Sequence, residues 1–194
     1  MKNLSGLILT GGRSTRMKRD KASLEYHGKK QSAAAFELLS NFCEKVFISN
    51  RQDQSKEQGQ RDFPQIHDLP IYEGIGPLAG ILSAMTEHSG IPWLVLACDL
   101  PFADQTTLKY LVDHRNSRKI ATAFISTSDN LPEPLCAIYE PRAKELLLSF
   151  FNDGKTCPRK FLINSKVELL KQPNPKALDN INTPEEYENA KKTL

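Results

Sequence analysis

Residues 4–12 read Leu-Ser-Gly-Leu-Ile-Leu-Thr-Gly-Gly, and this stretch decides the fold. Its apolar run is short and ends at two glycines, which is typical of a strand that is buried on both faces and then turns sharply. Apolar residues at helical spacing follow near residues 32–41, and residues 46–50 form a second apolar run. The chain therefore begins with a predicted strand, a helix and a second strand.

The same alternation continues along the chain. Glycine-rich residues 74–80 predict a tight loop that opens a helix to about residue 88, and residues 93–98 form the clearest predicted strand, which ends at Asp99. Further strands and helices are predicted at 105–115, 120–125, 135–139 and 145–151, and a capping box at 183–186 begins a last helix. We expect an α/β fold, a three-layer sandwich with a mostly parallel, Rossmann-like sheet, formed by residues 1–194 as a single domain.

The net charge of +3 conceals a local asymmetry. Residues 1–30 carry eight basic and two acidic side chains, whereas the rest of the chain carries 18 basic and 21 acidic ones. A general nucleic-acid binder needs a basic face spread over the whole domain. The local excess instead favours a small anionic ligand, and we expect no nucleic-acid partner.

No apolar run approaches the length of a membrane span, and no signal peptide is recognised, so we expect no membrane association. The four cysteines are too far apart in sequence for the paired spacing of a zinc or redox site. They are expected to be buried thiols in a reducing compartment. These observations predict a cytoplasmic protein.

The glycine turn after the first strand is the most informative segment. Gly11 and Gly12 allow backbone N–H groups to converge on an anion. Five cationic residues follow within nine positions: Arg13, Arg16, Lys18, Arg19 and Lys21. Together they suit a cradle for a polyphosphate. A solvated charge run after a glycine turn explains the same spacing equally well.

Polar residues also stand at the ends of other predicted strands, at Asn50, Asp68 and Asp99. Ligands of parallel sheets bind at the carboxyl ends of the strands, so these residues are candidates for a site. Asp99 could bind Mg²⁺ together with substrate phosphates, although from position alone a turn or cap role is the simpler explanation for Asp99 and more so for Asn50 and Asp68. The polar segment 52–61 is expected to lie on the surface and to carry no chemistry.

Other enzyme classes find no support. Residues 74–80 read G-x-G-x-x-x-G, which differs from the dinucleotide-binding fingerprint. The four histidines have no metal-binding spacing, and no nucleophile elbow occurs, so a zinc or serine hydrolase is not indicated. Each histidine is expected to be a surface or capping residue.

Four segments together carry a resemblance. They are L-x-G-G-x-S-x-R-M-x-x-D-K-A at 9–22, G-P-L-A-G at 76–80, C-D-x-P at 98–101 and N-x-N-T-P-E-E at 180–186. In this order they resemble the molybdenum cofactor guanylyltransferase family, within the nucleotide-diphospho-sugar transferase-like superfamily. The resemblance implies a nucleotidyltransferase domain that transfers GMP from GTP to the terminal phosphate of Mo-molybdopterin. The products would be the molybdopterin guanine dinucleotide cofactor and pyrophosphate.

The resemblance also implies a site. Its catalytic residues would be Arg16, Lys21 and Asp99, with Asp99 also the ligand of a Mg²⁺ cofactor, and Asn180 and Asn182 would lie on the acceptor side. The nucleotide would be bound by Leu9, Thr10, Gly11, Gly12, Lys21, Asn50, Asp68, Gly76, Pro77, Leu78 and Asp99. Protein partners could include other molybdenum cofactor pathway proteins or apo-molybdoenzymes.

Two alternatives stay open. One is a related nucleotidyltransferase that uses CTP or a sugar-phosphate acceptor. The other is a non-catalytic nucleotide-binding adaptor that retains the fold.

Overall fold

A computed structural model describes residues 3–10, 25–26, 29–55, 60–181 and 183–193 of the chain. The strands are β1 (Ser5–Leu9), β2 (Glu25–Tyr26), β3 (Lys29–Lys30), β4 (Lys45–Asn50), β5 (Gln65–His67), β6 (Trp93–Ala97), β7 (Ala121–Ile125), β8 (Pro132–Tyr139) and β9 (Val167–Lys171). The α-helices are α1 (Gln31–Ser40), α2 (Pro77–Glu87), α3 (Gln105–Asp113), α4 (Ala143–Asn152), α5 (Pro158–Ile163) and α6 (Pro184–Thr193). Two short 3₁₀ turns are η2 (Gln52–Gln54) and η3 (Pro70–Tyr72).

Seven strands form one mostly parallel sheet in the order β5-β4-β1-β6-β8-β7-β9. β8 runs antiparallel to both of its neighbours, while the pairs β5–β4, β4–β1, β1–β6 and β7–β9 are parallel. The predicted α/β fold with a mostly parallel sheet is confirmed. The chain moves outward from β1 to β4 and β5 and then returns past β1 to β6, so the strand order reverses at β1. In open α/β sheets, ligands bind outside the carboxyl ends of the strands at such a reversal.

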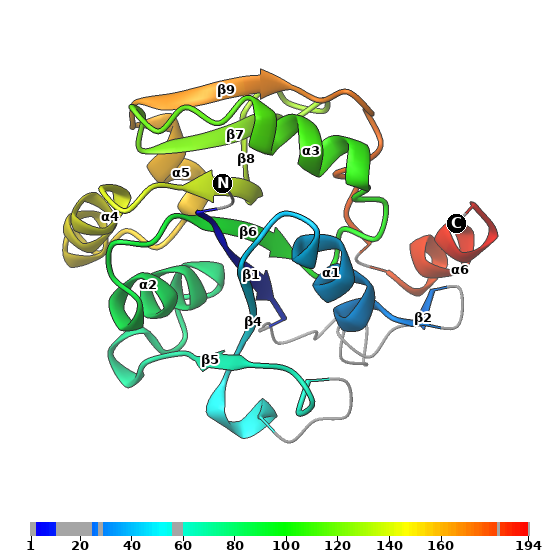
Figure 1. The fold of residues 1–194 in the computed structure, drawn as a ribbon, viewed down its shortest axis with the longest axis horizontal. Helices are drawn as coiled ribbons and strands as arrows, with labels where there is room; N and C mark the ends of the chain where they lie inside the picture. Colours follow the sequence, from blue (N-terminus) through cyan, green and yellow to red (C-terminus); the bar gives the residue numbers. More distant parts are fainter. Residues whose placement is uncertain (1–2, 11–24, 27–28, 56–59, 182, 194) are drawn as a thin grey trace.

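Helices cover both faces of the sheet, which gives the predicted three layers (Figure 1). On one face, α1 and α3 bury Leu39, Leu108 and Leu111 against Ile8 and other sheet residues. On the other face, α2, α4 and α5 form a second apolar core with β1, β6 and β8. β1 contributes to both cores, because all five of its residues are buried. The sequence pattern of a strand without a polar face therefore reflects its place at the centre of the sheet.

Two elements near the C-terminal part of the chain were not expected from the sequence. The short helix α5 and the edge strand β9 lie between the predicted helix at 145–151 and the last helix. Cys157, which immediately precedes α5, is exposed, whereas the other three cysteines are buried. The prediction that all four are buried is therefore wrong for Cys157, which stands at the exposed entry to a surface helix.

The predicted capping box at the start of α6 is confirmed. The Thr183 backbone N–H donates to Glu186 Oε2 at 3.0 Å, and the Glu186 N–H donates to Thr183 Oγ1 at 3.2 Å. This reciprocal pair satisfies two of the helix's first N–H groups. Tyr187 and Ala190 of α6 pack with Ile181 and Phe102, so the helix lies next to the loop that follows β6.

Candidate functional site

The register of the sheet places the predicted polar residues at one edge. Leu9 pairs with Ser49 on β4 and with Ala97 on β6, and Asn50 pairs with His67 on β5. The carboxyl ends of these four strands therefore lie side by side.

Backbone hydrogen bonds continue beyond the strands and fix the first residue of three of the loops. The N–H groups of Thr10, Asp68 and Cys98 donate to the carbonyls of Ser49, Asn50 and Leu9, at 3.1, 2.9 and 3.1 Å respectively. The structure thus brings Leu9, Thr10, Asn50, Asp68 and Asp99 to one edge, as the sequence predicts. Gly11, Gly12, Arg16, Lys21 and Asn182 lie outside the described residues.

Helix α2 presents its N-terminus to the same edge. Gly76 precedes the helix with φ 68° and ψ −146°, a conformation that only glycine adopts readily, and Pro77 occupies the first helical turn. Leu78 is fully buried in the core beneath. The N-terminus of a helix carries a partial positive charge, so this end favours an anionic ligand.

Gly80 allows α2 to lie close to the sheet. A Cβ at this position would meet Ser49 Oγ and, at 2.9 Å, Leu9 Cδ2. Leu9 and Ser49 are paired residues near the ends of β1 and β4. The lack of a side chain at Gly80 therefore sets how near the loop at 76–78 comes to these strand ends.

A buried network of amides links the strand ends, and Asn50 lies at its centre. Asn50 Nδ2 donates to Gln60 Oε1 at 2.6 Å and to Gln65 Oε1 at 3.1 Å, and Asn50 Oδ1 lies 2.7 Å from His67 Nδ1. Because an amide oxygen only accepts hydrogen bonds, His67 Nδ1 is the donor. Asn50 is fully buried, so its side chain orients its neighbours from below the edge.

Gln60 was missed by the sequence analysis. It belongs to the polar segment 52–61, which was expected on the surface, yet its side chain is fully buried and Gln54 is also buried. The expectation is wrong at these two positions. Their side-chain amides form hydrogen bonds inside the protein, and these bonds offset the free-energy cost of burying a polar group. A lone glutamine in a polar segment gives no sequence signal for this.

Asp68 has a perturbed pKa. Burial raises the pKa of its carboxyl from the ordinary 3.8 to about 6, with Arg51 opposing the change and Glu73 adding to it. A carboxyl with a pKa near neutrality beside a ligand crevice is a candidate functional group.

Asp99 follows β6 and is joined to the C-terminal part of the chain. The Ile181 N–H donates to the Asp99 carbonyl oxygen at 3.1 Å. Asn180, predicted on the acceptor side, is therefore held near Asp99, although the two motifs lie far apart in sequence.

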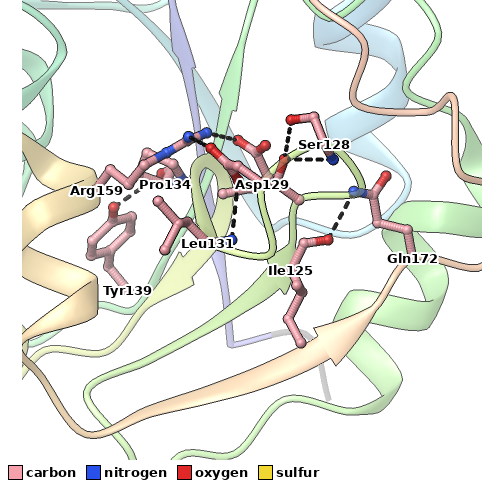
Figure 2. A network of polar contacts seen from close by, with 10 residues as sticks. Ile125, Ser128, Asp129, Leu131, Pro134, Tyr139, Arg159 and Gln172 are labelled. Atoms are coloured by element: carbon pink, nitrogen blue, oxygen red, sulfur yellow. Dashed lines mark hydrogen bonds and ion pairs between the residues drawn. The ribbon is translucent and has the colours of Figure 1, made fainter.

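The residues preceding Asn180 are held along the same edge. Gln172 Nε2 donates to the Ile125 carbonyl at 3.0 Å, Thr127 Oγ1 to the Pro175 carbonyl at 3.4 Å, and Asn174 Nδ2 to Asp104 Oδ2 at 3.1 Å. Figure 2 shows the first of these bonds beside the turn between β7 and β8. Residues 172–181 thus run from the end of β9 to the end of β6.

The donor set at Asp99 suits Mg²⁺. No group of three or more His, Cys, Asp and Glu side chains that could hold a metal occurs among the described residues. Mg²⁺ is commonly bound by one or two carboxylates together with substrate phosphates, without a complete protein cage. A single carboxylate at the strand reversal therefore fits this ion better than it fits a structural metal.

Two of the other histidines have packing roles, and His27 lies outside the described residues. His88 ends α2 and packs against Phe47 and Trp93, and His114 ends α3 and stacks on Tyr110. His67, however, belongs to the amide network, which the expectation of surface or capping roles did not include. Among the helices of the described residues, none combines the length and the hydrophobicity of a membrane span.

Comparison with known proteins identifies relatives over nearly the whole chain. The family model described as "MobA-like NTP transferase domain" matches residues 6–169. A probable molybdenum cofactor guanylyltransferase of Clostridium perfringens is 33% identical over 194 residues, which cover 95% of this chain and 94% of that protein. A molybdenum cofactor biosynthesis bifunctional protein of Synechocystis is 36% identical over 184 residues, and this chain spans 52% of its length.

Solved structures share the fold. The molybdopterin-guanine dinucleotide biosynthesis protein A of Archaeoglobus fulgidus superimposes with a TM-score of 0.80 over 97% of both chains, at 24% identity. A 4-diphosphocytidyl-2C-methyl-D-erythritol synthase of Anaerococcus prevotii superimposes with a TM-score of 0.71 over 98% of this chain, at 11% identity. The fold alone therefore does not select the nucleotide.

Proposed function

We propose that this chain, which belongs to the MobA-like NTP transferase family, transfers GMP from GTP to the terminal phosphate of Mo-molybdopterin. The products are molybdopterin guanine dinucleotide and pyrophosphate. The observation that carries the proposal is the near full-length match to a probable molybdenum cofactor guanylyltransferase. The fold supports it, because residues 50, 68 and 99 lie at the carboxyl ends of strands around the reversal at β1. In this proposal residues 1–194 act as a single nucleotidyltransferase domain.

The reaction needs alignment more than acid–base chemistry. The terminal phosphate of the acceptor attacks the α-phosphorus of GTP, a new phosphoanhydride bond forms, and the bond to the leaving pyrophosphate breaks. A phosphate monoester is already anionic near neutral pH, so no base has to remove a proton. The protein must hold the two reactants in line and offset the charge that develops.

The residues divide into two groups. On the nucleotide side, the Leu9 to Gly12 backbone, Asp68 and the loop at 76–78 would contact GTP, while Asn50 would act from its buried position. Arg16 and Lys21 would offset charge on the triphosphate and the leaving pyrophosphate. On the other side, Asn180 and Asn182 would lie near the acceptor.

Asp99 lies where the two groups meet. It would hold the Mg²⁺ cofactor, which when bound supplies charge neutralisation to the phosphates. The Ile181–Asp99 hydrogen bond supports this division, because it joins the acceptor-side segment to the end of β6.

The setting follows from the substrates. GTP and Mo-molybdopterin are the small-molecule partners in this proposal, and other molybdenum cofactor pathway proteins or apo-molybdoenzymes would be the protein partners. A cytoplasmic location is part of the proposal, because free thiols such as buried Cys43, Cys98 and Cys136 are typical of reducing compartments.

The test is pyrophosphate release by the purified protein with GTP, Mg²⁺ and Mo-molybdopterin. We expect Asp99→Ala and Lys21→Ala each to lower turnover by at least about a hundredfold, as loss of a transition-state contact does, while far-ultraviolet circular dichroism is unchanged. Asp129→Ala, a carboxylate on the β7–β8 turn, serves as the matched control and should retain full turnover.

Three outcomes would contradict the proposal. Near-normal turnover of folded Asp99→Ala would exclude its assigned role. A preference for CTP over GTP would favour a cytidylyltransferase, which the shared fold of the Anaerococcus enzyme allows. Binding of GTP without pyrophosphate release from any pterin acceptor would favour a non-catalytic adaptor.

A further inference from the structure

Gln60 touches more of the nucleotide side of the site than its sequence context suggests. Its Oε1 accepts from Asn50 Nδ2 at 2.6 Å and lies 3.2 Å from Thr10 Oγ1. Its backbone carbonyl accepts from Gln65 Nε2 at 2.9 Å. A single buried residue thus contacts the end of β1, the end of β4 and the start of β5.

The contacts leave the Asn50 amide one orientation. Gln65 Nε2 donates to the backbone carbonyls of Ser55 and Gln60, at 3.1 and 2.9 Å, so Gln65 Oε1 faces Asn50. A rotated Asn50 amide would place its oxygen against this oxygen and lose the bond, so Asn50 Nδ2 is the donor to both Gln65 and Gln60. Gln60 therefore helps to fix the side chain of Asn50, the residue of β4 that pairs with His67 on β5.

The same oxygen also restrains Thr10, the last described residue before the glycine turn. The Thr10 hydroxyl lies 2.9 Å from the Ser49 carbonyl and within reach of Gln60 Oε1, and its backbone N–H bonds to Ser49 as well. Thr10 is buried. The point at which the chain leaves β1 toward Gly11 is thus held by β4 and by Gln60 together.

We propose that Gln60 is a positioning residue for the nucleotide, coupling the exit of β1 at Thr10 to Asn50 on β4. It does not touch the substrate, and it acts by holding two residues of the nucleotide side in a fixed relative position. The inference rests on the proposed function, and it adds a residue that neither the motifs nor the family resemblance indicates. Its neutral amide is suited to this task, because a buried charge at the same place would require a partner.

The experiment compares two buried glutamines of the same segment. Gln60→Met keeps the side-chain length and removes the acceptor oxygen. Gln54→Met is the matched control, because Gln54 is also buried and its Oε1 accepts from the Arg51 N–H at 3.3 Å, away from Thr10 and Asn50. The Kd of GTP with Mg²⁺ is measured by calorimetry, and KM and kcat are measured by pyrophosphate release.

We expect Gln60→Met to raise the Kd and KM of GTP about tenfold, the effect of losing one or two buried hydrogen bonds, with a much smaller change in kcat. Gln54→Met should bind GTP as the wild type does, even if both variants lose thermal stability. A double-mutant cycle with Thr10→Val tests the coupling: Thr10→Val should weaken binding in the wild type but add little to Gln60→Met.

The outcomes distinguish failure of the positioning role of Gln60 from failure of the proposed function. If the wild type binds GTP and the two glutamine variants bind it equally well, or if the effects of Thr10→Val and Gln60→Met simply add, the positioning role is overturned. If the wild type itself binds no GTP, the proposed function fails first, and the role falls with it. Should Gln60→Met not fold, Gln60→Asn replaces it, because its amide stays neutral but its shorter side chain cannot reach Asn50 Nδ2 and Thr10 Oγ1 together. A Kd for GTP raised about tenfold in this variant supports the role, and wild-type binding overturns it.

Discussion

The two halves of the sheet stabilise their polar groups in different ways. In the half formed by β5, β4 and β1, the polar residues buried near the strand ends include the neutral Thr10, Asn50 and Gln60, and the first two both bond to Gln60 Oε1. In the half formed by β8, β7 and β9, opposite charges are paired. Arg115 makes two bonds to Glu140, at 2.6 and 2.8 Å, and Arg159 bonds to both Asp129 and Glu133.

The difference has a physical consequence for each half. Neutral amides can be buried without a counter-charge, provided that each is hydrogen-bonded. On the proposed function, they would hold the strand ends in place without cancelling the charges of a triphosphate and its cation. The Arg159 pairs instead tie the β7–β8 turn to α5, as Figure 2 shows for Arg159 and Asp129. We infer that the first half is organised for a ligand and the second for structure.

The close approach of α2 gives the largest expected effect. Gly80→Ala places a methyl group against Ser49 and Leu9, and overpacking of this kind costs about 1–3 kcal/mol of unfolding free energy. Because α2 must shift away from the strand ends, the KM for GTP should rise as well. Urea unfolding and steady-state kinetics provide the two measurements.

A matched control for Gly80→Ala lies in the other half. Gly154, with φ +74° and no atom within 4 Å of where a Cβ would lie, stands two residues after the end of α4. Gly154→Ala should cost about 1 kcal/mol through backbone strain and leave KM unchanged. A normal KM in Gly80→Ala would show that the position of α2 does not matter to the nucleotide.

The pH dependence of two aspartates should have opposite signs. The raised pKa of Asp68, about 6 in the folded state, means that the protein holds this proton more tightly than the unfolded chain does. The stabilising contribution is present below pH 4 and is lost as the pH rises through about 6. As the pH rises through this range, the unfolding free energy of Asp68→Asn should therefore increase relative to that of the wild type. We expect a difference of about 1 kcal/mol, because solvent screening of a partly exposed group reduces the effect of the full pKa shift.

Asp129 provides the contrast. The Leu131 N–H, together with Ser126 and Arg159, holds the pKa of this carboxyl below its usual range, although desolvation opposes the shift. Its contribution is present above the usual pKa and is lost as the pH falls below it, so Asp129→Asn should narrow its stability difference from the wild type in acid. Thermal unfolding from pH 3 to pH 7 measures both variants. The same sign for the two would contradict the comparison.

The smallest effect is expected at Arg159. Its two ion pairs are partly exposed, and such pairs contribute at most about 1 kcal/mol. Arg159→Met keeps the aliphatic stem, so it should lower the unfolding free energy slightly in low salt and less in high salt. Turnover and KM should not change. A loss of activity would assign this cluster a role in the reaction.

The parts of the fold that could be predicted are those whose cause is local. The apolar runs that became β1, β4 and β6, the glycine loop before α2 and the Thr183 capping box each carry their own signal. α5 has only six residues, which is too few to show helical periodicity, and β9 is an edge strand that mixes charged and apolar residues. These two elements depend on tertiary contacts: β9 pairs with β7, and α5 packs Phe161 and Leu162 into the core.

The site divides in the same way. The positions of Asn50, Asp68 and Asp99 at the strand ends could be predicted, because polar residues after buried strands mark the edge of a parallel sheet. The burial of Gln60 and the bond between Ile181 and Asp99 could not. Both depend on partners that only the tertiary fold brings near, and residue type alone carries no trace of them.

The bond from Ile181 to Asp99 has a consequence for the order in which the site can be assembled during synthesis. A chain made from its N-terminus has β1, β4, β5 and β6 once the ribosome has added residue 97, whereas the carbonyl of Asp99 acquires this partner only after residue 181. Bringing residues 99 and 181 together closes a long loop, which costs more conformational entropy than forming contacts between residues close in sequence. On the proposed function, the strands of the nucleotide side lie within the first 97 residues, whereas the acceptor side also needs residues near 181.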